Sequence, residues 1–129
     1  MENPKDLLYT KEHEWIRVKG DIGTVGITDY AQHQLTDIVF AELPEKGKMV
    51  EQTKSFAVVE SVKSVSDVYA PASGEVIEVN NALANAPEKI NKDPYGEGWI
   101  AKIKIKDKKE LDKLMKPEQY EEYLKRTGH

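Results

Sequence analysis

Short runs of β-branched and aromatic residues, separated by glycine, proline and asparagine, occupy most of this chain. The clearest pair covers 56–62 and 65–69, joined by the tip residues Lys63 and Ser64 and followed by a turn at 71–74. Runs of this length are typical of strands, and turns at this frequency join antiparallel neighbours. They predict a mainly β fold, namely a small β-sandwich or flattened barrel.

Further strands are expected on both sides of this hairpin. An earlier hairpin turns at Gly20, and 38–43 is apolar enough to predict a buried strand. In 100–106, three apolar residues alternate with three lysines, which predicts a half-solvated strand near the edge of its sheet. The other expected strands are 14–18, 22–27 and 75–80.

Helices are expected in two places. Thr28 or Asp29 can cap a short helix that ends at Leu35 and covers a sheet. Residues 81–99 are expected to form a loop with about one helical turn. The tail has apolar residues at helical spacing, and Pro117 suits the first turn of its second helix. These tail residues are Leu111, Leu114, Met115, Tyr120, Tyr123 and Leu124.

Length and composition limit the class of protein. The 129 residues are about one domain long, with an expected core at about 8–106 and a helical tail at about 107–126. A net charge of −4 gives no basic surface for nucleic acid or an anionic membrane. No apolar run approaches the roughly 18 residues of a membrane span, and the first residues lack signal-peptide features. We therefore expect a soluble cytoplasmic protein.

Metal and thiol chemistry are not expected. The chain has no cysteine, which excludes disulfides, thiolate ligands and a cysteine nucleophile. Its three histidines, His13, His33 and His129, are too scattered for a metal-binding motif. No metal site is predicted, and any sulfur chemistry must come from an attached group.

Lys63 stands apart from the other basic residues. Seventeen of the 19 basic residues are lysines, yet Lys63 is the only lysine between Lys54 and Lys89. An even distribution would place about four or five lysines there, since lysine is a common surface residue. A lysine at a hairpin tip is open to a modifying enzyme while the strands hold its backbone, which indicates covalent use. Taken alone, however, Lys63 fits an ordinary solvated lysine better than a modified one.

The residues around Lys63 resemble the lipoyl-attachment hairpin of the glycine cleavage system H-protein family. The similar stretch runs from Phe56 to Pro71, with Gly47 sixteen positions before Lys63 and Gly74 eleven after it. The resemblance spans roughly residues 8 to 125 and implies a lipoyl/biotinyl-domain-like sandwich. Other similar motifs are His13-Glu14-Trp15, Gly26-Ile27-Thr28, Leu43-Pro44, Ser73-Gly74-Glu75-Val76, Asn91 and Pro94-Tyr95-Gly96-Glu97-Gly98-Trp99.

Two rival carrier families fit less well. Biotin carriers usually have Met-Lys-Met, and lipoyl domains of 2-oxoacid dehydrogenase complexes usually have Asp-Lys-Ala. Here Val62 and Ser64 flank the lysine. The latter domains are also shorter, and they lack both the segment 91–99 and the helical tail.

The resemblance implies a covalent cofactor carrier and not an enzyme, with lipoate joined to Lys63. The carrier would take the aminomethyl group of glycine from the pyridoxal-phosphate-dependent glycine decarboxylase (P-protein) to the tetrahydrofolate-dependent aminomethyltransferase (T-protein). Dihydrolipoyl dehydrogenase (L-protein) would then reoxidise the arm. A lipoate ligase or a lipoyl/octanoyl transferase would attach it.

An H-protein-like lipoate relay, acting mainly in lipoyl transfer to other acceptors, is the alternative. An enzyme acting alone has little support, because no nucleophile and base pair is evident.

The resemblance also implies a cleft that protects the loaded arm. A carboxylate beside the aminomethyl nitrogen favours its protonated form, which lacks the lone pair that would expel the thiolate. Glu14 and Asp67 are the candidates, and Ile27, Ala31 and Leu35 are expected to line the cleft. Acidic residues on a solvated rim are an equally open interpretation of each carboxylate.

Several neighbouring positions keep two interpretations. Glu60 could supply charge recognition to the ligase, Gly74 could fix the turn opposite the tip, and Val62 could hold the lysine outward. Strand packing explains Val62 better. Many H-proteins have a histidine where this chain has Gln34, beside His33, so neither residue is assigned a role.

Overall fold

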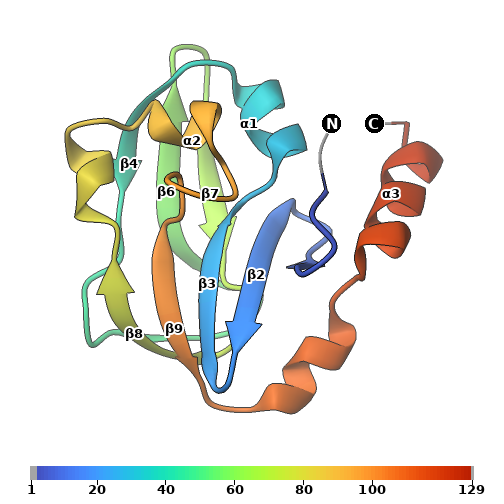
Figure 1. The fold of residues 1–129 in the computed structure, drawn as a ribbon. Helices are drawn as coiled ribbons and strands as arrows, with labels where there is room; N and C mark the ends of the chain where they lie inside the picture. Colours follow the sequence, from blue (N-terminus) through green and yellow to red (C-terminus); the bar gives the residue numbers. More distant parts are fainter. Residues whose placement is uncertain (1–2, 129) are drawn as a thin grey trace.

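The computed structural model describes residues 3–128 as two antiparallel sheets packed face to face (Figure 1). The six-stranded sheet has the order β1-β2-β3-β9-β8-β5, and the three-stranded sheet has the order β4-β6-β7. The mainly β sandwich is confirmed, and the sheets do not close into a barrel. The strands are β1 (Leu8–Tyr9), β2 (Glu14–Lys19), β3 (Ile22–Ile27), β4 (Ile38–Glu42), β5 (Met49–Val50), β6 (Ser55–Ser61), β7 (Val65–Tyr69), β8 (Gly74–Val79) and β9 (Ala101–Ile105).

The first hairpin and its helix form as predicted. β2 and β3 pair with Glu14 opposite Ile27, and Gly20 takes the left-handed turn position with φ 64°. The Thr28 hydroxyl then accepts the Ala31 N–H at 3.2 Å, which caps helix α1 (Asp29–Leu35). Helix α1 follows β3 directly. Glu14 pairs with the last residue of β3 and therefore lies at the end of the hairpin that is nearer to the helix.

The second hairpin is also confirmed, with a correction at its tip. β6 pairs with β7 through Glu60 opposite Val65 and Val58 opposite Asp67. β6 ends at Ser61 and β7 begins at Val65, so the connection holds Val62 as well as the predicted Lys63 and Ser64. Val62 is 68% exposed, and its predicted strand packing is wrong because the residue lies beyond the last paired position.

Two expectations about burial and position are wrong. Strand β4 was expected to be buried, but Val39 and Phe40 are 51% and 52% exposed, on either side of a register shift between Ile38 and Phe40. Strand β9 was expected near an edge, but it pairs with both β3 and β8. The alternating lysines therefore indicate a solvated face, which an interior strand can also have.

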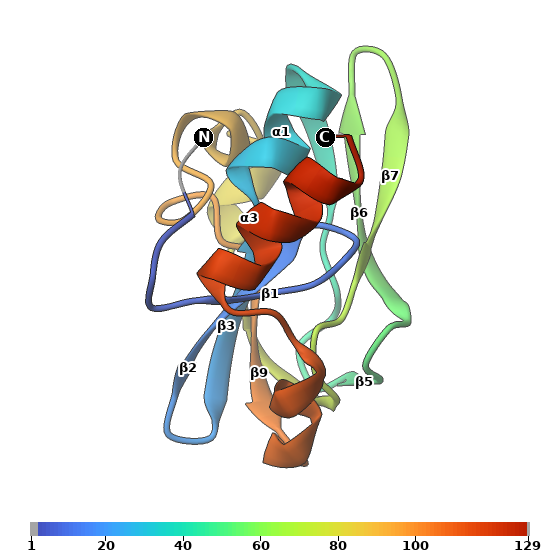
Figure 2. The same ribbon diagram turned by 90° about the vertical axis from the view of Figure 1, so that its right-hand side faces the viewer.

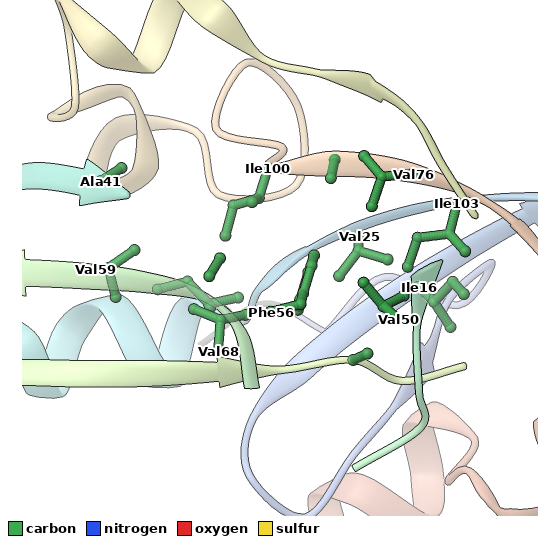
Figure 3. Packing of buried hydrophobic residues seen from close by; sticks show 14 of the residues in the cluster. Ile16, Val25, Ala41, Val50, Phe56, Val59, Val68, Val76, Ile100 and Ile103 are labelled. Carbon is green, nitrogen blue, oxygen red and sulfur yellow. The ribbon is translucent and has the colours of Figure 1, made fainter. Parts of the chain in front are cut away.

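The main core fills the space between the two sheets (Figure 3). Ile16 and Val25 of the six-stranded sheet meet Val59 and Val68 of the three-stranded sheet, and each is at most 1% exposed. Ala101, Ile103 and Ile105 of β9 join this core, which confirms the alternation read from the sequence. Burying each of the valine and isoleucine side chains contributes about 1.5–3 kcal/mol to folding.

A second, aromatic cluster attaches the tail, whose helix α3 (Pro117–Arg126) crosses in front of β1 in Figure 2. The rings of Tyr9 and Tyr120 stack at 4.7 Å, and Tyr120 is fully buried. Pro117 begins α3 as predicted, because proline lacks the N–H that the first turn cannot use. The first tail segment is not an α-helix but a 3₁₀ helix, η2 (Lys108–Lys113), and Met115 beyond it pairs with Tyr9.

The polar passage after β8 contains two short helices where about one helical turn was expected. They are η1 (Asn81–Ala84) and α2 (Lys89–Lys92), and they bury Leu83 and Ile90 in the main core. Within the described residues no helix is long and apolar enough to cross a membrane. His129 lies outside the described residues.

Candidate functional site

The hairpin tip holds the backbone of Lys63 and leaves its side chain exposed. Ser61 is 6% exposed, and its hydroxyl accepts the N–H groups of Lys63 at 3.3 Å and Ser64 at 3.1 Å. The Ser61 N–H donates to the Ser64 carbonyl at 2.8 Å and closes the turn. Within residues 3–128 no carboxylate pairs with the Lys63 ammonium. The amine is therefore accessible on a fixed backbone.

The tip rests on the junction between α1 and β4. The Val62 N–H donates to the Asp37 carbonyl at 3.1 Å. Asn91 fixes this junction, since its amide donates to the Thr36 carbonyl at 2.8 Å and accepts the Ile38 N–H at 2.9 Å. Asn91 thus supports the segment to which the Lys63 turn is hydrogen-bonded.

Glu14 is buried where the two sheets approach each other. It is 1% exposed, accepts the Thr10 hydroxyl at 2.5 Å, and accepts the Tyr69 N–H at 3.1 Å. Tyr69 ends β7, the strand that begins two residues after Lys63. Burial raises the pKa of Glu14 to about 7, although both hydrogen bonds favour the carboxylate. The carboxyl can therefore change charge near neutral pH.

Glu14 lies in the wall of a surface cavity of about 420 Å³. The walls come from four parts of the chain, and most of the lining is apolar. The lining residues are 9–12, Glu14, Gln52, Thr53, 69–71 and 113–115. The cavity thus places one buried carboxyl group within mainly apolar walls.

Two residues beside this cavity have left-handed backbones that residues with side chains rarely adopt. His13, which precedes Glu14, has φ 73°, and Thr53 has φ 74°. The His13 N–H donates to Thr10, and the Thr53 N–H donates to Ala70, at 3.2 and 2.8 Å. Each such conformation costs about 1–3 kcal/mol, which the surrounding contacts must offset. Strain of this kind gathers at functional sites.

The other predicted cleft residues lie outside the cavity wall. Asp67 is exposed on β7, and the Ser55 hydroxyl donates to it at 2.8 Å. Ile27 is buried opposite Glu14, but it packs in the main core, against which Ala31 and Leu35 are half-buried. The structure brings Glu14 and Ile27 together as strand partners, while Asp67 lies two positions before Tyr69 of the cavity.

The remaining positions have distinct surroundings. A methyl group on Gly74 would lie 2.0 Å from the Lys104 carbonyl oxygen, so glycine is required by the close approach of β9. Glu60 is half-buried between Phe40 and Val65 in adjacent strands. His33 and Gln34 are exposed on α1. Among residues 3–128, no three His, Asp or Glu side chains are placed to hold a metal ion.

Three site residues were missed by sequence reasoning. Ser61 braces the tip, and Thr10 and Tyr69 hold the Glu14 carboxyl group. The four-residue spacing of Thr10 and Glu14 was a usable signal, because threonine commonly hydrogen-bonds within a turn. The Tyr69 contact uses a backbone N–H and has no sequence signal.

Comparison with known proteins is consistent with this geometry. Residues 7–127 match the family described as Glycine cleavage H-protein. The glycine cleavage system H protein of Symbiobacterium thermophilum is 58% identical over 95% of both chains, and that of Thermus thermophilus is 56% identical over 96% of this chain and 97% of the other.

A solved structure agrees with the fold. The crystal structure of a glycine cleavage system H protein from Mycobacterium marinum has a TM-score of 0.85 and 40% sequence identity, covering 98% of this chain and all of the other. The sequence and structural matches extend over nearly the whole chain. This protein belongs to the glycine cleavage H-protein family.

Proposed function

We propose that this protein is the lipoyl-bearing carrier of the glycine cleavage system. Lys63 would hold lipoate in an amide bond, and the protein would carry the aminomethyl group of glycine from glycine decarboxylase to the tetrahydrofolate-dependent aminomethyltransferase. Dihydrolipoyl dehydrogenase would restore the arm, and a lipoate ligase or a lipoyl/octanoyl transferase would attach it. The observation that carries this proposal is the exposed Lys63 side chain on a braced turn of an H-protein family member.

The surroundings of Lys63 fit a covalently attached arm. Acylation removes the ammonium charge, and among the described residues no ion pair would be broken by that change. Lipoate supplies a cyclic disulfide for redox and group-transfer chemistry, in a chain without cysteine. Ser61 and Asn91 keep the attachment point fixed, since each hydrogen-bonds the backbone of the turn or its support.

Glu14 and Asp67 are proposed to protect the cargo during transit. Asp67 lies on β7, four residues after Lys63, and the Glu14 cavity lies beyond it near Tyr69. The protonated amine of the aminomethyl cargo, if placed near Glu14, would lower the pKa of this carboxyl group. The resulting carboxylate would in turn keep the amine protonated. The mainly apolar walls limit access of water.

Reconstituted glycine–bicarbonate exchange tests the proposed function. The lipoylated protein should support exchange with glycine decarboxylase, and the unmodified protein should not. If the lipoylated protein does not support exchange but passes lipoyl groups to other acceptors, the relay function is the correct one.

A further inference from the structure

Exposed apolar side chains gather around the attachment lysine. Among the described residues, five large hydrophobic side chains are exposed, and four of them lie beside the tip. Phe40 and Val65 are 52% and 64% exposed, and they flank Glu60 on adjacent strands. We call these four residues the tip patch: Val39, Phe40, Val62 and Val65. Clustered exposure of this kind marks interaction sites more often than scattered exposure does.

The face that carries the tip patch is acidic. One row across β4, β6 and β7 is Phe40, Glu60 and Val65, and the next row on the same face is Glu42, Val58 and Asp67. These six positions hold three carboxylates and no lysine or arginine. Acylation of Lys63 would remove the positive charge of the turn that joins β6 and β7. A complementary surface therefore has an apolar centre surrounded by basic side chains.

We infer that the tip patch and its carboxylates form the surface on which glycine decarboxylase docks when it receives the Lys63 arm. This inference rests on the proposed function, in which glycine decarboxylase is the enzyme that loads the Lys63 arm. The predicted decarboxylase surface is an apolar depression with lysine or arginine side chains facing Glu42 and Glu60. A second copy of this chain is a poor occupant, because the same carboxylates would face each other.

The small size of the patch suits a carrier. Four side chains at one end of the three-stranded sheet can bury only a small area, which corresponds to weak, transient association. A carrier must leave each enzyme after transfer, so weak docking is compatible with repeated visits. Val62 adjoins Lys63, and docking on the patch would thus place the arm at the enzyme surface.

Matched threonine substitutions test the docking surface. Phe40→Thr and Val65→Thr remove apolar contact and place a β-branched residue, which strands favour, at each position. Met49→Thr is the control, because Met49 is 59% exposed and lies on β5 of the other sheet. All variants are lipoylated, and circular dichroism and thermal unfolding verify their folding. The readout is the KM and kcat of glycine decarboxylase for the carrier in glycine–bicarbonate exchange.

We expect Phe40→Thr to raise KM about five- to tenfold with kcat within about twofold, as for loss of a docking contact. Val65→Thr should raise KM about threefold, and Met49→Thr should match the parent. Glu42→Gln should weaken the dependence of KM on salt. Parental KM values for both Phe40→Thr and Val65→Thr would overturn the inference. So would a change confined to the lipoylation rate or to the aminomethyltransferase step.

The two levels of proposal fail in different ways. Absence of exchange with the lipoylated parent protein contradicts the carrier function itself. Normal exchange by the parent, with unchanged KM in the patch variants, contradicts the docking surface alone.

Discussion

The two sheets of this sandwich differ in what lies on their outer faces. The six-stranded sheet carries Trp15 on a face covered by the aromatic cluster, and it holds Glu14 in a nearly solvent-free position. The three-stranded sheet leaves Phe40 and Val65 exposed and ends in the Lys63 turn. The comparison teaches that the larger sheet encloses side chains away from solvent, while the smaller sheet leaves large apolar side chains exposed on its outer face.

The largest expected effect concerns the close packing of the larger sheet. Gly74→Ala should lower the free energy of unfolding by about 3 kcal/mol or more, because the added methyl group would meet the Lys104 carbonyl oxygen. Gly47→Ala is the control, since Gly47 has open space around it but a φ of 94°. It should cost only about 1–2 kcal/mol. Equal losses in urea unfolding would contradict the packing explanation for Gly74.

The pH dependence of stability tests the burial of Glu14. Its pKa in the folded state is about 7, above the ordinary 4.5, so the folded protein binds this proton more tightly than the unfolded chain. Tighter binding of this proton stabilises the folded state fully below about pH 4.5, and the stabilisation is lost as the pH rises through 7. Its contribution to the free energy of unfolding is about 3 kcal/mol.

Glu14→Gln should remove this part of the pH dependence. Urea unfolding of parent and variant at pH 5 and pH 8 measures it. The free energy of unfolding of the parent should fall relative to the variant between these two values. Parallel curves would show that Glu14 does not titrate in this range.

Paired valine substitutions on the smaller sheet and its tip compare burial with exposure directly. Val68 is fully buried in β7, whereas Val62 is 68% exposed in the turn. Val68→Ala should cost about 2 kcal/mol, and Val62→Ala should change stability by less than about 0.5 kcal/mol. A large loss at Val62, measured by thermal or urea unfolding, would mean that the tip contributes to the core.

The last prediction concerns the lifetime of the cargo. Glu14→Gln should speed ammonia release from the loaded carrier about tenfold, equal to about 1.4 kcal/mol, because the neutral amide no longer favours a protonated amine. Asp67→Asn should have a smaller effect, since Asp67 is exposed and screened by solvent. Release is measured without the transferase, after confirming full lipoylation. Parental rates in both variants would remove these residues from the protective role.

The elements were largely predictable from sequence, because local patterns specify them. The Thr28 cap, the Gly20 turn and the alternation in β9 each depend on a few neighbouring residues. The position of β9 inside its sheet depends on pairing with β3 and β8, which its own alternation cannot reveal. Burial of β4 likewise depends on what packs against it, and the apolar composition of 38–43 could not show that Phe40 is exposed.

The candidate site was predictable only in part. Lys63 was found from its isolation and its flanking motifs, and the structure places it in an exposed turn. Glu14 was also named, but the cavity around it is built from segments far apart in the chain. Ile27, Ala31 and Leu35 suited an apolar lining by residue type, yet they pack in or against the main core. Residue type could not distinguish these two uses of apolar surface.

Attachment of the arm to Lys63 is the central claim, and intact mass with peptide mapping tests it most directly. The parent protein and Lys63→Arg are treated with a lipoate ligase under the same conditions, with thermal unfolding as a check that both are folded. The parent should gain one lipoyl group, mapped to Lys63, and Lys63→Arg should gain none. A lipoyl group on another lysine of the parent, or equal gain of mass in the variant, would contradict the account.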